Sequence, residues 1–169
     1  PADGTRLLRH LLDYLRSTMP ASTQGATLGD EADLVASYLA IVAIRMSGQL
    51  QVEIDVPPSL RSQPCPPLTL ATLVENAVRH GIAPAPAGGT IAIQARRDAE
   101  VLELTVADTG VGIAGAADAN PGGTGIGLAN VRARLRALHG NAASLTIAGN
   151  VPNGVRAVIR LPCTDVAAR

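Results

Sequence analysis

The stretch ADTGVGIAGAADANPGGTGIGL, residues 107–128, joins a run of alternating apolar residues to a predicted helix and is rich in glycine. Within it, Gly110, Gly112 and Gly115 spell G-x-G-x-x-G, the pattern of a dinucleotide-binding turn. That turn must lead straight into a helix, and an acid on a second parallel strand must follow about 20 residues later. Pro121 and its neighbouring glycines interrupt the residues that would have to form this helix, and no such strand follows. The sequence therefore argues against a dinucleotide fold.

A second glycine cluster, Gly123, Gly125 and Gly127, comes directly before a helix predicted over residues 126–140. Glycines at a helix start let phosphates approach the backbone, where free N–H groups and the helix dipole favour anions. Asp108 precedes the first cluster, and its carboxylate can accept a hydrogen bond from an exocyclic amine such as that of adenine. The two clusters predict a nucleotide site with the linker between them as a lid. The alternative is a glycine-rich hairpin loop with a solvated aspartate.

The elements around this stretch decide the fold class. Apolar residues at helical spacing predict helices, and alternation of apolar and polar residues predicts strands. Helices are expected over residues 5–19, 29–47, 68–80 and 126–140, and strands over 49–56, 90–97, 101–108, 143–149 and 154–162. The alternation in 49–56 puts Leu50, Val52, Ile54 and Val56 on one side, so this strand is expected to be half buried. Thr27 and Asp30 resemble a capping box, and Gly81 is expected to end the third helix. Because most strands come in hairpins, the order predicts an α+β fold: a two-layer α/β sandwich with a mixed, mostly antiparallel sheet and helices on one face.

Composition narrows the function classes. The chain has 169 residues, 47% of them hydrophobic, and a formal net charge of zero, so a nucleic-acid surface that works by bulk charge is not expected. There is no Phe or Trp to form a base-stacking platform. Cys65 and Cys163 fit no metal or disulfide pattern and are expected to be buried or half-buried thiols. No apolar run is long enough to cross a bilayer.

The predicted helix in LTLATLVENAVRHG, residues 68–81, has a polar face formed by Thr72, Asn76, Arg79 and His80. Asn is a mild defect in mid-helix, and its amide oxygen is a ligand that Mg²⁺ accepts together with nucleotide phosphates. Arg79 can neutralise phosphate charge. His80 is compatible either with a phosphate contact or with an ordinary helix end. The helix therefore predicts a metal and phosphate face.

Three segments carry a family resemblance. LVENAVRHG, DTGVGI and GGTGIGLANVRARL resemble the N, G1 and G2 boxes of the histidine-kinase branch of the GHKL ATPases. LLDYLR, ASYLAIVAIRM and PPLTLATLVENAVRHG are similar, more narrowly, to the LytS class of sensor histidine kinases. The resemblance runs from about Leu11 to Pro162 and implies the Bergerat ATP-binding fold. It implies that residues 27–169 are the ATP-binding catalytic domain and that residues 1–26 are the end of a dimerisation and phosphoacceptor region with its linker.

The resemblance also implies roles for single residues. Asn76 would ligate Mg²⁺, and Arg79 and His80 would face the phosphates in the catalytic site. Glu75 belongs to the same catalytic set, although the residues alone favour a solvated surface acid. The cofactor-binding residues that the resemblance implies for ATP are Asp108, Gly110, Gly112, Ile113, Gly123, Thr124, Gly125, Ile126, Gly127 and Leu128. Thr72 and Val155 depart from the class, which usually has Gln and commonly has Thr at these positions.

The function implied is transfer of the γ-phosphoryl of Mg–ATP to a histidine on an upstream segment not present in this chain, in cis or in trans. The class keeps that histidine in an HFLFN-like stretch, whereas His10 lacks the neighbouring acid and is not expected to be the acceptor. A response regulator would be the next partner. The domain would be cytoplasmic, in a sensor attached to the membrane through N-terminal regions, and the apolar stripe of helix 5–19 allows a homodimer.

Two alternatives remain open at this point. One is the same fold used as a GHKL ATPase or an anti-sigma-type serine kinase. Hydrolysing members usually keep an acid one turn before the metal-binding Asn, and Thr72 holds that place here. The other is a degenerate nucleotide-binding interaction module, which the departures at Thr72 and Val155 favour.

Overall fold

The computed structural model of the chain describes residues 25–113 and 126–163. Within these ranges five strands form one sheet, in the order β1-β2-β3-β5-β4. The strands are β1 (Leu50–Asp55), β2 (Gly89–Asp98), β3 (Val101–Asp108), β4 (Ser144–Gly149) and β5 (Val155–Pro162). β1 pairs with β2 in parallel, and the other neighbours are antiparallel. The predicted mixed, mostly antiparallel sheet is confirmed.

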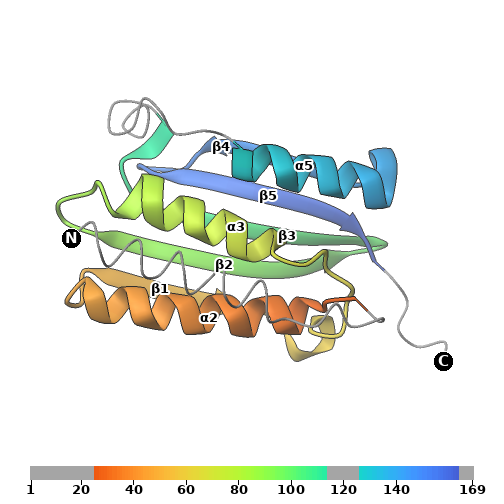
Figure 1. Cartoon of the computed structure of the whole chain (residues 1–169), viewed down its shortest axis with the longest axis horizontal. Helices are drawn as coiled ribbons and strands as arrows, with labels where there is room; N and C mark the ends of the chain where they lie inside the picture. Colours follow the sequence, from red (N-terminus) through yellow and green to blue (C-terminus); the bar gives the residue numbers. More distant parts are fainter. Residues whose placement is uncertain (1–24, 114–125, 164–169) are drawn as a thin grey trace.

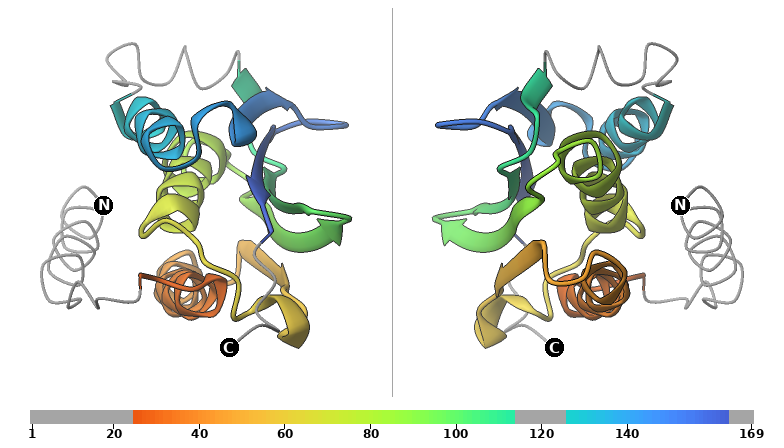
Figure 2. Two further views of the ribbon diagram at one scale, coloured as in Figure 1. Left: turned by 90° about the vertical axis from the view of Figure 1, so that its right-hand side faces the viewer. Right: turned by 90° about the vertical axis from the view of Figure 1, so that its left-hand side faces the viewer.

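The helices lie on one face of this sheet, and Figures 1 and 2 show the two layers. They are α2 (Leu28–Arg45), α3 (Thr69–Asn76) and α5 (Ile126–His139), with shorter helical turns η1 (Pro58–Leu60), η2 (Ala77–Ile82) and η3 (Gly140–Ala142). In Figure 1, α2 lies beside β1, α3 crosses the middle of the sheet, and α5 lies over β5 and β4. The two-layer α+β sandwich is therefore confirmed. None of the helices in the described ranges is both long and apolar enough to cross a membrane.

Strand alternation builds the core and also places one acid in it. On β3, Leu102, Leu104 and Val106 are at most 2% exposed and face the helices. Because side chains alternate along a strand, Asp108 is the next residue on that same face. Its exposure is also 2%, so the helix-facing alternation ends on a buried carboxylate at the last residue of β3.

The start of α2 confirms the capping box predicted from Thr27 and Asp30. The Asp30 N–H donates to Thr27 Oγ1 at 3.2 Å, and the Thr27 N–H donates to Asp30 Oδ2 at 2.9 Å. The Thr27 hydroxyl, which donates to Asp30 Oδ2 at 2.7 Å, and then the Thr27 N–H lower the pKa of the Asp30 carboxyl. Aspartate therefore replaces the usual glutamate in this box.

Two predictions of local structure are wrong. The strand at residues 49–56 was expected to be half buried, but Val52 and Ile54 are 36% and 38% exposed and only Leu50 is buried within β1. The reason is that β1 lies at the edge of the sheet that the described residues form. Gly81 does not end its helix, because η2 continues the winding to Ile82 with π-helical geometry. The predicted helix 5–19 and the domain boundary near residue 26 depend on residues outside the described ranges.

Candidate functional site

The buried Asp108 carboxylate is the centre of the candidate site. The backbone N–H of Gly110 donates to its Oδ1 at 2.9 Å, and the side-chain amide of Asn150 donates to its main-chain oxygen at 2.8 Å. Burial raises the pKa of Asp108, while the backbone amides of Gly110 and Val155 act in the opposite direction. A buried carboxylate that retains free acceptor capacity is suited to receive a donor from a ligand.

Glycines from three distant parts of the chain surround this carboxylate. An added Cβ on Gly81 would lie 2.5 Å from Asp108 Oδ1, and one on Gly110 would lie 2.1 Å from the Gly81 carbonyl oxygen. One on Gly154 would lie 1.9 Å from the Asp108 carbonyl oxygen. The Val111 N–H also donates to the Gly81 carbonyl at 3.1 Å. The end of β3 and the end of η2 are therefore in direct backbone contact, which only glycine allows here.

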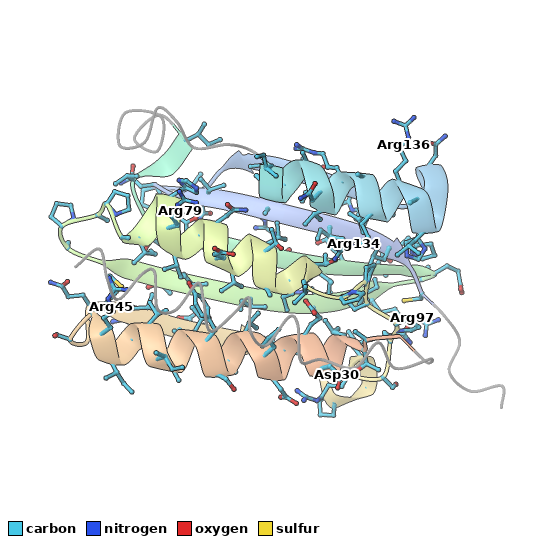
Figure 3. All side chains as sticks on the ribbon, viewed as in Figure 1. Asp30, Arg45, Arg79, Arg97, Arg134 and Arg136 are labelled. Atoms are coloured by element: carbon cyan, nitrogen blue, oxygen red, sulfur yellow. The ribbon has the colours of Figure 1, made fainter. Side chains whose placement is uncertain are left out.

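The change from α3 to η2 occurs beside these glycines. Short π-helical segments are rare in proteins, and those that do occur are often found at functional sites. Arg79 and His80 lie within η2, after the point where the α-helical spacing ends. Arg79 is exposed, and its side chain projects from the end of α3 and η2 in Figure 3. Burial, and then the charge of Arg79, lower the pKa of His80, against the opposing charge of Glu75. Both effects favour the neutral form of the His80 imidazole.

Asn76, the last residue of α3, faces the start of α5. Its side-chain nitrogen is buried and has no hydrogen-bond partner among the described residues. An added Cβ on Gly127 would lie 3.8 Å from that nitrogen and 3.2 Å from Thr72 Cγ2. The Thr72 hydroxyl donates to the Leu68 carbonyl at 2.6 Å, so Thr72 presents its methyl group to α5. The side-chain nitrogen of Asn76 thus lies near the start of α5 without a hydrogen-bond partner among the described residues.

These residues fit a nucleotide with its cation. Asp108 offers an acceptor at one end of the site, and at the other Asn76 places its amide, whose nitrogen is unpaired among the described residues, near the start of α5. An amide oxygen suits Mg²⁺, and the start of a helix suits phosphate. The part of the chain that the structure describes holds no group of three or more His, Cys, Asp or Glu residues arranged for a metal.

Comparison with known proteins agrees with this arrangement. Residues 68–165 match the profile of the family described as histidine kinase-, DNA gyrase B- and HSP90-like ATPases. The chain belongs to this family. The sensor histidine kinase BtsS of Escherichia coli (strain K12) is 32% identical to it over 164 residues, which are 97% of this chain and 28% of BtsS. The sensor histidine kinase YesM of Bacillus subtilis (strain 168) is 31% identical over 161 residues, 95% of this chain and 28% of YesM.

Solved structures show the same fold. The catalytic domain of the histidine kinase ThkA superposes with a TM-score of 0.63 at 17% identity, covering 83% of this chain and 97% of that one. The mycobacterial sensor histidine kinase MprB gives 0.57 at 21% identity, with the same coverage. The chain spans only 28% of the length of its relatives BtsS and YesM. Together these findings confirm the predicted ATP-binding catalytic domain of the histidine-kinase type.

The predicted site residues of this ATPase-family domain lie in different surroundings, with Arg79 and His80 in η2. Asn76, Asp108, Gly110 and Gly127 line the arrangement described above. Ile113 and Ile126 are 53% and 59% exposed, and in the sequence they flank residues 114–125, which are outside the described ranges. Gly112 has a positive φ of 78°, Leu128 and Glu75 are partly buried, and Gly123, Thr124 and Gly125 lie outside the described residues. Their binding roles, and the proposed lid, stay predictions.

Gly81, Gly154 and Asn150 also contribute to the site, and the sequence analysis did not assign them to it. Gly81 follows the predicted metal-binding helix, so its position in the N-box stretch was the available signal. Gly154 and Asn150 flank the loop between β4 and β5, and no local pattern marks them as neighbours of Asp108. Only the pairing of β3 with β5 brings that loop to the end of β3.

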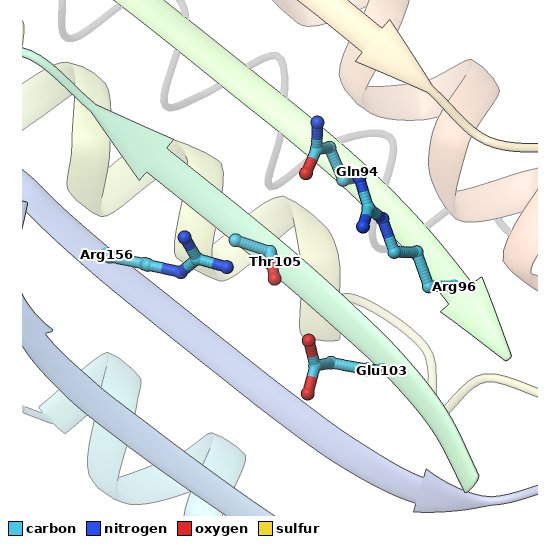
Figure 4. A pocket seen from close by; sticks show the side chains of 5 residues that line it. All are labelled: Gln94, Arg96, Glu103, Thr105 and Arg156. Carbon is cyan, nitrogen blue, oxygen red and sulfur yellow. The ribbon is translucent and has the colours of Figure 1, made fainter. Parts of the chain in front are cut away.

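A separate hollow of about 210 Å³ lies on the opposite, helix-free face of the sheet (Figure 4). Its walls are Gln94, Arg96, Glu103, Thr105 and Arg156. Glu103 forms an ion pair with Arg160 at 2.9 Å on the same face. The hollow contains none of the predicted nucleotide-binding residues.

The raised pKa of the buried Asp108 carboxyl predicts that the free energy of unfolding depends on pH. Because its pKa in the folded chain is raised above the ordinary 3.8, the folded chain binds this proton more tightly than the unfolded chain. The contribution of Asp108 to stability is therefore fully present at pH values below 3.8, and it is lost as the pH rises through the raised pKa of the folded chain. We expect the unfolding free energy of the wild type, minus that of Asp108→Asn, to decrease as the pH rises towards 7. Denaturant unfolding at a series of pH values measures this, and a flat or increasing difference would contradict it.

Proposed function

We propose that this ATP-binding domain uses Asp108, Asn76 and the two glycine clusters to hold Mg–ATP for phosphoryl transfer to a histidine of a longer protein. The observation that carries the proposal is the buried Asp108 carboxylate, which keeps free acceptor capacity at the point where Gly81, Gly110 and Gly154 bring three backbone segments together. The relatives BtsS and YesM are named as sensor histidine kinases. A response regulator is the proposed recipient of the phosphoryl group from that histidine.

Each residue has a distinct task in this proposal. Asp108 accepts a hydrogen bond from the exocyclic amine of adenine. The backbone contact of Gly81 with Gly110 holds the end of β3 beside η2 and so keeps this carboxylate in place. The amide oxygen of Asn76 would hold Mg²⁺ together with the phosphates, beside the N–H groups at the start of α5. Arg79 supplies positive charge near the phosphates. Bound Mg–ATP supplies the phosphoryl group, and the chain contributes positioning and charge compensation.

Transfer to a protein side chain is favoured over simple hydrolysis by the residue one turn before Asn76. Water attack on ATP needs a group that orients or deprotonates the water. Thr72 occupies that turn, and its hydroxyl is already bonded to the Leu68 carbonyl at 2.6 Å. With its methyl group towards α5, Thr72 is not placed to act as a base.

Titration with a non-hydrolysable ATP analogue, with Mg²⁺ and in EDTA, tests the proposal. The wild-type chain is expected to bind the analogue, and Mg²⁺ is expected to tighten binding. Asn76→Ala should lose most of that tightening, about 10-fold or more, while it keeps the affinity measured in EDTA. Calorimetry gives both constants for both proteins. No binding by the wild type, or an unchanged effect of Mg²⁺ in Asn76→Ala, would overturn the proposal.

A further inference from the structure

A buried acid outside the candidate site holds the start of the helix that carries Asn76. Glu31 lies in the first turn of α2 and is only 1% exposed. Its Oε1 accepts the N–H of Leu68 at 2.6 Å, and its Oε2 accepts the N–H of Leu70 at 2.9 Å and of Ala71 at 3.4 Å. These amides lie in and just before the first turn of α3, where a helix has no partners of its own.

The N-cap residue of α3 does not itself accept hydrogen bonds from these amides through its side chain. Leu68 is the N-cap residue, has a left-handed φ of 62°, and has no side-chain group to accept from the first turn. A carboxylate on another helix therefore replaces the usual Ser, Thr, Asp or Asn cap, and its charge is favourable beside a helix N-terminus. Burial raises the pKa of Glu31, while the three amides and the nearby charge of Arg134 favour the ionised form.

A second side chain, from α5, binds the backbone directly before α3. The guanidinium of Arg134, on α5, donates to the carbonyl of Pro67, directly before Leu68. In Figure 3, Arg134 points from α5 towards the start of α3. Arg134 follows Gly127 by about two helical turns, and Gly127 contacts Thr72 and approaches Asn76 near the other end of α3. The two helices are thus antiparallel, and each end of α3 is in register with a defined turn of α5.

We propose that Glu31 is a positioning residue, which acts with Arg134 to set α3 so that the Asn76 amide faces the start of α5. This inference rests on the proposed role of Asn76 in Mg–ATP binding. Without these contacts at its N-terminus, the short helix α3 would shift or fray, and the Asn76 amide at its C-terminal end would move relative to Gly127. Asp108 belongs to β3 and does not depend on this cap, so binding of the base should be preserved.

The test separates positioning from general stabilisation. Affinity for a non-hydrolysable ATP analogue is measured, with Mg²⁺ and in EDTA, for the wild type, Glu31→Gln, Asn76→Ala and the double variant. Glu31→Gln keeps the size of the side chain but turns an N–H₂ group towards backbone donors. We expect it to reduce the tightening by Mg²⁺ about 10-fold and to leave the affinity in EDTA unchanged. In the Asn76→Ala background it should change nothing further, because both substitutions act through the same amide.

Asp33→Asn is the matched control. It makes the same change of charge on the same helix, at an exposed acid that forms an ion pair with Arg61 at 2.7 Å. It should behave as the wild type. If Glu31→Gln does not fold, Arg134→Gln loosens the same point from α5 and should give the same pattern. A full effect of Mg²⁺ in these variants, or a further loss in the double variant, would overturn the positioning role. Absence of nucleotide binding by the wild type would instead overturn the proposed function.

Discussion

Gly110→Ala is expected to lower the free energy of unfolding by about 3 kcal/mol and to abolish nucleotide binding. The added methyl would lie 2.1 Å from the Gly81 carbonyl oxygen and 2.6 Å from the Gly81 Cα. Both are backbone atoms, so no flexible side chain can move aside, and a cost at the upper end of the overpacking range is expected. The hydrogen bond from Val111 to that carbonyl would be lost as well. For a chain of this size the melting temperature should decrease by about 10 °C.

Gly149→Ala is the control for this substitution. Gly149 ends β4, and an added Cβ there would meet nothing within 4 Å. Both variants exchange glycine for alanine at or just beyond the end of a strand, and they differ in what surrounds the methyl group. Thermal unfolding and analogue binding should leave Gly149→Ala close to the wild type. Equal stability and affinity in the two variants would show that the contact between β3 and η2 does not shape the site.

Asp108→Asn is expected to weaken binding of ATP by about 10- to 100-fold. A hydrogen bond to a charged acceptor contributes about 1.5–3 kcal/mol, and each 1.4 kcal/mol corresponds to a factor of ten. Because the carboxylate is 2% exposed, water cannot take over its bond with the adenine amine. The loss should appear both with Mg²⁺ and in EDTA, because Asp108 addresses the base and not the cation. This distinguishes it from Asn76→Ala.

Asp55→Asn provides the comparison for Asp108→Asn. Asp55 is the last residue of β1, on the parallel neighbour of β2, and it is exposed. The same change of charge at an exposed strand end should leave the affinity within about twofold, since surface charges contribute little. Guanosine and adenosine nucleotides should be compared in the same titration, because adenine carries its exocyclic amine at C6, where guanine carries a carbonyl that cannot donate to a carboxylate. Unchanged affinity of Asp108→Asn for ATP would contradict the assignment of the base site.

The sequence predicted most of the fold from local patterns. Alternation predicted the hairpin of β2 and β3, and helical spacing predicted α2 and α5 to within a few residues. These predictions succeed because side-chain periodicity follows directly from backbone geometry. The exposure of Val52 and Ile54 was not predictable in this way, because it depends on β1 lying at the edge of the sheet.

The residues around the candidate site also divide into those that local sequence patterns could select and those that they could not. Asp108 and Asn76 were selected from sequence because an acid after an apolar strand, and an amide in mid-helix, are locally unusual. Glu31 was not selected, because an acid in the first turn of a helix is ordinary. Its burial and its three bonds to α3 arise from the packing of α2 against a segment more than 35 residues away.

By itself, the sequence determined the elements, the family resemblance and the residue types available to bind a nucleotide, since each depends on neighbours along the chain. Only the tertiary structure decided that Gly81, Gly110 and Gly154 meet around one carboxylate, that the helix after Asn76 winds as a π-helix, and that α2 caps α3. These features depend on contacts between segments far apart in sequence, where the steric fit of backbone against backbone selects glycine and the burial of a charge demands partners.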